Sequence, residues 1–253
     1  MEAYYKNNDV TIYNGDCLEI MSELDITFDA CITDPPYGTT ACKWDSVIPF
    51  EPMWSNLKRL VKSNGAICLF GSEPFSSALR MSNIKMFKYD WIWDKKTGLG
   101  FLDSKFRPLK QHENISVFSN AGCSNGSKPP MCYYPQGLIK TCKKNSNTKS
   151  SILNSEPSKR TNLNTEYTNY PKTVLSFSRE VGFHPTQKPV ALIEYLIKTY
   201  TNENNIVLDF TCGSGTTGLA AMNTNRRCVL IEQEEKYCEI SASRCEEARR
   251  NIA

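Results

Sequence analysis

The sequence predicts an α/β protein built on one mostly parallel sheet with helices on its faces. Short runs rich in β-branched residues alternate along the chain with longer amphipathic segments, which is typical of such a sheet. Of the 253 residues, 40% are hydrophobic and 23% are charged, as is ordinary for a globular protein. A chain of this length can bury one sizeable core, so we expect one large domain with an insertion.

Seven segments have the composition of strands. Only a loop separates the strand around Trp91 from the strand around Ile115, which leaves no room for a crossover helix. We therefore expect an antiparallel pair at one edge of the sheet. The predicted strands are Val10–Asn14, Ala30–Asp34, Ala66–Phe70, Tyr89–Trp93, Ile115–Phe118, Ile206–Asp209 and Cys228–Glu232.

Helices are predicted between these strands. In the last of them, apolar residues recur at steps of three and four from Cys238 to Ile252, so they form one stripe that can face the sheet. The predicted helices are Leu18–Leu24, Pro52–Lys62, Pro74–Asn83, Pro189–Tyr200, Thr216–Asn223 and Glu235–Asn251.

The regular alternation stops between Ser119 and Glu180. Of these 62 residues, 24 are Ser, Thr or Asn, and nine Lys or Arg against three Glu give a net charge of +6, whereas the remainder carries −3. A structureless loop of this length is unusual in a compact domain, so we interpret it as a small insertion. The predicted organisation is a first half over residues 1–118, the insertion over 119–180 and a second half over 181–253.

Composition also argues against two classes of protein. No apolar run approaches the roughly 20 residues needed to span a bilayer, and the amino-terminal sequence lacks the features of a signal peptide, so we expect a cytoplasmic protein. The eleven cysteines lack CxxC spacing and only two histidines are present. We therefore predict no disulfide framework and no bound metal.

A ligand-binding pattern follows the sixth predicted strand. Residues 207–217 read VLDFTCGSGTT, a strand that enters a helix through a Gly-Ser-Gly turn. Such a turn lets backbone N–H groups approach a ligand at the positive end of the helix. The next strand ends at Glu232, where an acid can accept hydrogen bonds from ribose hydroxyls. The turn lacks GxGxxG and GK[ST] spacing, so we predict an adenosine-containing cofactor other than NAD or a nucleoside triphosphate.

A second informative pattern, TDPPYG, ends the second predicted strand at residues 33–38. Its prolines remove two backbone donors, which leaves carbonyl acceptors beside the carboxylate of Asp34. Such acceptors suit an exocyclic amine, because they can hold both of its protons while the nitrogen becomes more nucleophilic. Tyr37 can stack on the ring that carries this amine. The alternative is a proline-terminated strand with a capping aspartate.

Together these motifs resemble the S-adenosylmethionine-dependent DNA amino-methyltransferases, whose catalytic signature is D/N/S-P-P-Y/F/W. Here DPPY comes first, the basic insertion second, HPTQKP at residues 184–189 third and the glycine turn last. This order is similar to that of the β class of the family. The resemblance spans the chain apart from the insertion, and it implies a seven-stranded Rossmann-like sheet, a target-recognition role for the insertion and S-adenosylmethionine as cofactor.

The resemblance also implies roles for individual residues. The catalytic loop comprises Asp34, Pro35, Pro36 and Tyr37. Lys188 is expected near the methionine carboxylate, Glu232 at the ribose and Asp16 near the adenine ring. The family's turn usually carries its aromatic one position later than Phe210. The expected cofactor-binding residues are Asp16, Asp34, Lys188, Asp209, Phe210, Gly213, Ser214, Gly215, Thr216, Thr217 and Glu232.

The substrate implied by the resemblance is N6 of adenine, because Asp rather than Ser occupies the first signature position. A base amine inside a duplex cannot reach such a pocket, so the base must be flipped out. Cytosine-N4 methylation stays open as an alternative, as do an RNA or a protein-glutamine methyltransferase and a non-catalytic DNA-binding protein. The order of the motifs argues against the protein-glutamine enzyme, and the intact signature and turn argue against loss of activity.

DNA contacts are expected in the insertion and in the loop between the two edge strands. Basic residues there can bind phosphates or read bases, although a solvated surface has the same composition. A homodimer and a cognate restriction endonuclease are further partners that the resemblance adds to duplex DNA. The candidate DNA-binding residues are Lys105, Arg107, Lys128, Lys143, Lys144 and Arg160.

Overall fold

The structure is a computed structural model that describes residues 2–39, 45–141, 166–180, 182–183 and 186–252. The chain divides into two compact units. Residues 1–134 and 173–253 form the main unit, and residues 135–172 form the small unit. The two units are described separately.

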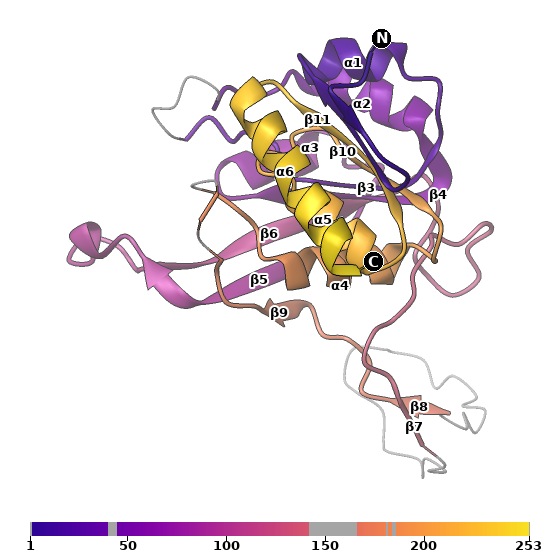
Figure 1. Cartoon of the computed structure of the whole chain (residues 1–253). Helices are drawn as coiled ribbons and strands as arrows, with labels where there is room; N and C mark the ends of the chain where they lie inside the picture. Colours follow the sequence, from indigo (N-terminus) through magenta and orange to yellow (C-terminus); the bar gives the residue numbers. More distant parts are fainter. Residues whose placement is uncertain (1, 40–44, 142–165, 181, 184–185, 253) are drawn as a thin grey trace, which may run out of the picture. The chain divides into compact units, whose positions relative to one another are not determined.

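A mixed sheet forms the centre of the main unit (Figure 1). Its described strands follow the order β1-β2-β11-β10-β3-β4-β6-β5-β9. Adjacent strands in the stretch β2-β11-β10-β3-β4 are parallel, whereas β6 is antiparallel to both β4 and β5. The strands are β1 (Tyr5–Lys6), β2 (Val10–Asn14), β3 (Phe28–Thr33), β4 (Val61–Gly71), β5 (Phe87–Leu99), β6 (Lys110–Phe118), β9 (Val174–Ser176), β10 (Ile206–Asp209) and β11 (Arg227–Glu232).

The predicted fold class is confirmed, and each predicted strand has a counterpart in the sheet. The antiparallel pair is β5 and β6, but β6 lies between β4 and β5 rather than at the border. The reason is that a crossover through α3 (Phe75–Ser82) returns β5 parallel to β4, and the β6 arm of the hairpin fills the space between them. The strands β1 and β9 were not predicted, because two or three residues carry no readable periodicity.

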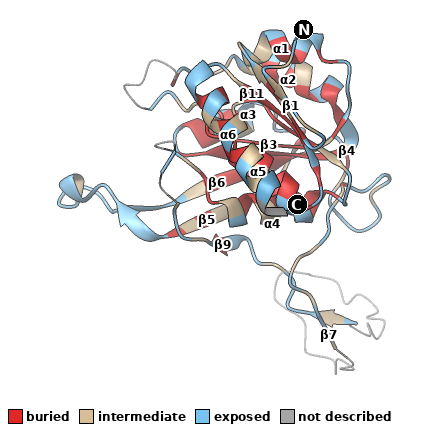
Figure 2. Cartoon of the chain, in the orientation of Figure 1, coloured by how far each residue is buried: buried red, intermediate tan, exposed pale blue. Residues whose placement is uncertain are grey.

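Three helices cover each face of the sheet in the described part of the main unit (Figure 1). Side chains alternate between the faces, so Ala30 and Ile32 of β3 pack with α4–α6 whereas Cys31 packs with α1–α3. Figure 2 shows the buried strands beneath helices with exposed outer surfaces. The helices besides α3 are α1 (Cys17–Glu23), α2 (Phe50–Leu60), α4 (Val190–Tyr200), α5 (Thr216–Asn223) and α6 (Glu235–Ile252).

The described part of the predicted stripe on α6 packs against the core on this face of the sheet, where Cys238 and Cys245 are fully buried. Helix α6 also packs against α5, which begins directly after the Gly-Ser-Gly turn. Within the described ranges, no helix is both long and apolar enough to cross a bilayer.

The small unit spans fewer residues than the predicted insertion, 135–172 against 119–180. Its described part contains the antiparallel strands β7 (Ile139–Lys140) and β8 (Tyr167–Thr168). Seven Lys or Arg and two Glu give residues 135–172 a net charge of +5. Residues 119–134 and 173–180, which the sequence placed in the insertion, belong to the main unit. The predicted DNA-binding residues Lys143, Lys144 and Arg160 lie outside the described residues.

Candidate active site

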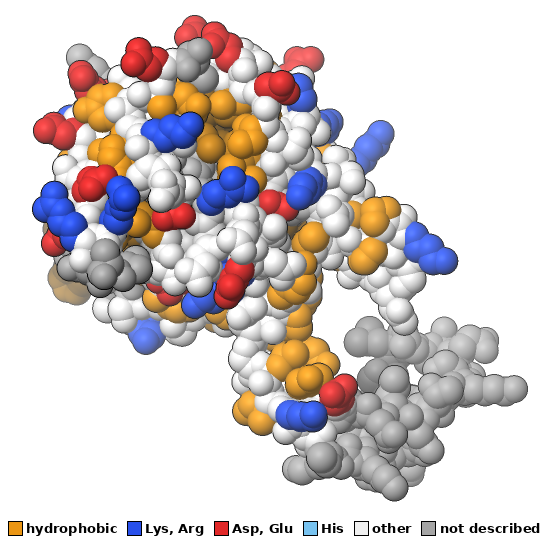
Figure 3. Space-filling model, turned by 45° about the vertical axis from the view of Figure 1, so that its right-hand side comes forward, with side chains coloured by type: hydrophobic (Ala, Val, Ile, Leu, Met, Phe, Trp, Pro, Cys, Tyr) orange, Lys and Arg blue, Asp and Glu red, His pale blue; other side chains and the backbone are white. Residues whose placement is uncertain are grey.

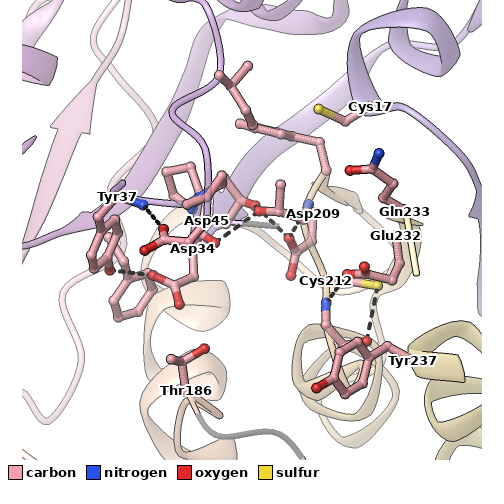
Figure 4. A pocket seen from close by; sticks show the side chains of 18 of the residues that line it. Cys17, Asp34, Tyr37, Asp45, Thr186, Asp209, Cys212, Glu232, Gln233 and Tyr237 are labelled. Atoms are coloured by element: carbon pink, nitrogen blue, oxygen red, sulfur yellow. Dashed lines mark hydrogen bonds between the residues drawn. The ribbon is translucent and has the colours of Figure 1, made fainter. Parts of the chain in front are cut away.

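A cavity of about 270 Å³ opens where the parallel strands end. Ligands of open α/β sheets bind at this carboxyl edge, and the volume is close to the lower end of the roughly 300–1,000 Å³ typical of small-molecule pockets. Figure 4 shows Asp34 and Tyr37 on one side, Glu232 and Tyr237 on the other and Asp209 between them. Segments far apart in the sequence therefore face one space, and all of its lining residues belong to the main unit.

Nearly all the predicted catalytic and cofactor residues line this cavity. The exception is Gly215, the last residue of the Gly-Ser-Gly turn, whose Cα faces Ser241 of α6 instead of the cavity. Phe210 lines the cavity although the sequence places this aromatic one position early. The residues brought together are Asp16, Asp34, Pro35, Pro36, Tyr37, Lys188, Asp209, Phe210, Gly213, Ser214, Thr216, Thr217 and Glu232.

Helix α6 supports the glycine turn from behind. Gly215 has φ +76°, and a Cβ there would overlap Ser241 of α6, so this position needs glycine. The buried Arg244 donates to the carbonyl of Ser214 at 2.5 Å and to its hydroxyl at 3.1 Å. Sequence reasoning missed Ser241 and Arg244, because the only signal was their place on a helix face. The turn is thus held in place while its front faces the cavity.

Two acids at strand ends offer anchored acceptors. Glu232 accepts the N–H of Gly213 at 2.8 Å and that of Glu234 at 2.9 Å, and burial raises its pKa. Asp16 caps α1 by accepting the N–H of Leu18 at 2.8 Å. Each carboxylate keeps lone pairs for a ligand, because two oxygens can accept about four hydrogen bonds.

Asp209 links the cofactor turn to the catalytic loop. Its carboxylate accepts the Thr33 hydroxyl at 2.6 Å, the Thr217 hydroxyl at 2.5 Å and the Thr211 N–H at 3.2 Å. The Thr211 hydroxyl then donates to the carbonyl of Asp34 at 3.0 Å. Burial raises the pKa of Asp209 to about 6. These contacts tie β10, β3 and α5 together, so Asp209 positions the turn.

The carboxylate of Asp34 is already engaged on both oxygens. The Tyr37 hydroxyl donates to Oδ1, and the Lys188 ammonium donates to Oδ2 (Figure 4 shows the contact with Tyr37). The Tyr37 ring stacks on Phe75, with 5.1 Å between ring centroids and 26° between planes. Any ligand that donates a hydrogen bond to this carboxylate must therefore share an oxygen with Tyr37 or Lys188 or displace one of them. Burial raises the pKa of Asp34, and the charge of Lys188 opposes that rise.

Asp45 fixes the chain immediately after the two prolines. Its buried carboxylate accepts the backbone N–H groups of Tyr37 and Gly38 at 2.8 Å each and of Thr39 at 2.9 Å. Successive N–H groups form a concave anion site, so the negative charge of Asp45 holds the loop in this shape. Sequence reasoning missed Asp45, because its distance from the signature matches no recognised spacing.

A chain of four charges extends from the cavity into the protein. The Lys188 ammonium contacts Asp34 and also lies 3.5 Å from Oε2 of Glu113, whose Oε1 accepts Lys95 at 2.5 Å. Burial disfavours charge on Lys188, but the two carboxylates outweigh this and raise its pKa. Burial also opposes charge on Glu113, yet the two lysines lower its pKa. Lys188 and Glu113 are therefore charged near neutral pH. No sequence pattern pointed to Glu113.

The described DNA-binding candidates lie at opposite edges of the sheet. Lys105 and Arg107 are exposed in the loop between β5 and β6, which leaves the sheet at the cavity edge. Lys128 is exposed in a loop after β6, held by a hydrogen bond of 2.9 Å from the Cys132 N–H to the carbonyl of Asn64. Because β6 is antiparallel, this loop emerges at the edge away from the cavity. Lys128 therefore lies away from the cavity, whereas Lys105 and Arg107 lie on its side of the sheet.

An Asp-Pro-Pro-Tyr loop and a glycine turn that line one cavity are the arrangement expected of a methyltransferase that acts on amino groups. The family model N6_N4_Mtase, described as DNA methylase, matches residues 28–243. The chain belongs to this family, the S-adenosylmethionine-dependent DNA amino-methyltransferases.

Curated relatives and solved structures agree with this assignment. The chain is 27% identical to the type II methyltransferase M.ScaI of Streptomyces caespitosus, over 97% of this chain and 84% of the relative. It is 25% identical to M2.MboI of Moraxella bovis, over 98% and 92%. The M1.HpyAVI–SAM complex is 25% identical with a TM-score of 0.63, over 93% of this chain and 99% of that chain. The cytosine-N4-specific PvuII methyltransferase, 16% identical with a TM-score of 0.66 over 99% and 95%, shares the fold alone.

S-adenosylmethionine is the cofactor, and the residues of the cavity suit it. When bound, it supplies a methyl group already activated on a positively charged sulfur. Glu232 and Asp16 present acceptors for ribose and base donors, and Phe210 supplies an apolar wall. The amino end of α5 offers positive charge to a carboxylate, and Lys188, which is paired with Asp34 and Glu113, lines the same cavity.

Proposed function

We propose that this protein is a site-specific DNA methyltransferase that methylates N6 of an adenine flipped out of duplex DNA. The observation that carries the proposal is the carboxylate of Asp34, which faces the cavity shared with the glycine turn. Aligning an amine with an activated methyl group is the main catalytic requirement, and a rigid cavity meets it by positioning.

The catalytic loop suits an amine attached to a planar ring. Asp34 accepts protons of the amine, while Pro35 and Pro36 present no backbone N–H that would compete for it. Tyr37 can stack on the base, a contact worth roughly 1–3 kcal/mol. When the nitrogen forms its bond to the methyl group, the bond from that methyl to sulfur breaks and the nitrogen must release a proton, for which Asp34 is the proposed acceptor. Asp45 keeps this loop in shape throughout.

Adenine is the proposed base because aspartate stands first in the signature. Cytosine-N4 is the alternative, and the fold shared with the PvuII enzyme does not decide between them. The test incubates the protein with S-adenosylmethionine and unmodified duplex DNA, and then separates the digested nucleosides by mass. The proposal expects N6-methyldeoxyadenosine; N4-methyldeoxycytidine as the product would contradict the choice of base.

Substitution of Asp34 tests the chemistry directly. Asp34→Ala should lower methyl transfer by about 100-fold or more, in line with loss of one key polar group from an active site. Asp34→Asn should keep partial activity, because its amide oxygen still accepts a hydrogen bond. The control is Asp25→Ala, which removes an exposed carboxylate outside the cavity. Equal methyl incorporation by Asp34→Ala and the wild type would remove Asp34 from the mechanism.

Duplex DNA is the proposed partner, with contacts from the small unit and from Lys105 and Arg107. The small unit concentrates positive charge. In the view of Figure 3, Lys and Arg side chains of the main unit are instead dispersed among Asp and Glu. Basic residues concentrated in one segment suit a phosphate backbone better than basic residues mixed with acidic ones.

The biological role we propose is modification within a restriction–modification system in the cytoplasm, because several relatives are type II methyltransferases. Modification-sensitive sequencing of DNA from cells that express the protein would report the base and its sequence context together. We also propose a homodimer, which sedimentation equilibrium would test.

A further inference from the structure

The tip of the β5–β6 hairpin exposes large apolar side chains. Phe101 is 79% exposed, Leu102 95% and Phe106 89%. Folded proteins rarely leave neighbouring large apolar groups in water unless the surface has a binding function. Figure 2 shows this part of the hairpin as an exposed projection of the main unit.

The tip is ordered by its own hydrogen bonds. The N–H of Asp103 donates to the carbonyl of Gly100 at 3.0 Å, and the N–H of Phe106 donates to the carbonyl of Asp103 at 2.8 Å. The carboxylate of Asp103 also pairs with Arg107. The apolar side chains are thus presented on a closed turn rather than on a loose strand.

The position and charge of the tip favour a polyanionic partner. The hairpin leaves the sheet at the cavity edge, because Glu113 of β6 lines the cavity and pairs with Trp93 of β5. Residues 96–110 contain four Lys or Arg and one Asp, a net charge of +3. A second copy of this chain would bring two such charges together, whereas DNA offers phosphates beside stacked bases.

We propose that Phe101, Leu102 and Phe106 form a wedge that enters the DNA base stack beside the flipped target base. The inference rests on the proposed function. Flipping a base leaves a gap in the stack and costs pairing and stacking energy. Proteins fill such gaps with phenylalanine and leucine, and flanking lysines and arginines hold the backbone. Lys105 and Arg107 flank the wedge in this way.

The experiment measures kcat/KM for Phe106→Ala and Leu102→Ala on two duplexes that carry the recognition sequence. In one duplex the target base is paired. In the other it faces an abasic site, so that flipping breaks no base pair. We expect about 10-fold lower kcat/KM on the paired duplex, and recovery to within about twofold of wild type on the unpaired one. Met81→Ala is the matched control, because Met81 is 70% exposed on α3 and remote from the cavity edge.

Other outcomes overturn the wedge. Equal loss on both duplexes would indicate general binding, and full activity of both variants would indicate no role. A change from dimer to monomer in light scattering would assign the tip to a second copy. Wild-type protein that leaves duplex DNA unmethylated would overturn the proposed function together with the wedge, whereas active wild type with unaffected variants overturns the wedge alone.

Discussion

At the scale of the residue, the Lys188 ammonium forms ion pairs with two carboxylates, those of Asp34 and Glu113. Asp34 is the proposed acceptor for the substrate amine, whereas Glu113 also lines the cavity and is paired with Lys95 as well. The second carboxylate lets Lys188 move away from Asp34 without losing an ionic partner. The proposed mechanism makes Glu113 a positioning residue, because it acts through Lys188 on the carboxylate that is proposed to bind the amine.

Substitution of Glu113 tests this coupling. We expect Glu113→Gln to lower kcat by about 10-fold with little change in KM for the cofactor, since Lys188 then stays on Asp34. The free energy of unfolding should also fall by up to about 3–5 kcal/mol, because a buried ion pair loses one partner. Steady-state kinetics and urea unfolding measure the two effects. The control is Glu194→Gln, which weakens a more exposed ion pair with Lys198 outside the cavity; unchanged kcat in Glu113→Gln would contradict the role.

The buried Asp209 makes a pH prediction with a defined sign. Its folded pKa of about 6 lies above the ordinary value of 3.8, so between these values the folded state binds more protons than the unfolded state. This contribution to the free energy of unfolding is fully present below pH ~4 and is lost as pH rises to ~6, by up to about 3 kcal/mol. Urea unfolding between pH 4 and 7 should show a flatter profile for Asp209→Asn. Identical profiles for both proteins would contradict the prediction.

At the scale of the element, helix α6 determines the shape of the cofactor turn. Gly215 and Gly126 have φ of +76° and +90°, but only Gly215 faces a neighbour, Ser241, whereas Gly126 faces open space. Gly126→Ala should cost about 1 kcal/mol for its backbone conformation alone. Gly215→Ala should cost about 1–3 kcal/mol more, because the Cβ also displaces α6.

Chemical denaturation and calorimetric cofactor binding measure both glycine variants. We expect Gly215→Ala to weaken S-adenosylmethionine binding and Gly126→Ala to leave it unchanged. Adding Ser241→Gly to Gly215→Ala should recover part of the lost stability. Equal costs for the two glycine variants would show that α6 does not support the turn.

At the scale of the whole molecule, the uneven charge predicts a strong salt dependence of DNA binding. Each phosphate neutralised contributes a slope of about −0.9 to the plot of log K against log salt concentration. Lys105→Ala and Arg107→Ala should each make that slope shallower by about 1. Fluorescence anisotropy with duplex DNA at several salt concentrations measures these slopes, and Lys128→Ala serves as the control at the opposite edge. A flat response would count against DNA as the substrate.

The sequence alone determined the fold class, the positions of the main strands along the chain and thirteen of the residues that line the cavity. Hydrophobic periodicity reports burial directly, and DPPY, HPTQKP and the glycine turn are local patterns whose chemistry depends on adjacent residues. Phe210 and Glu232 could be assigned to the cavity because each lies at the carboxyl end of a predicted strand.

Only the tertiary structure decided which partners these residues have. Glu113, Asp45, Ser241 and Arg244 act through contacts that depend on chain segments packing together, and no local pattern encodes such a contact. The position of Lys128 also depends on the fold. Because β6 is antiparallel to β4, the loop that carries Lys128 leaves the sheet at the edge opposite the cavity, and strand direction is set by pairing within the whole sheet. Periodicity within a segment is therefore readable from the chain, whereas a charge or hydrogen-bond partner follows from the fold.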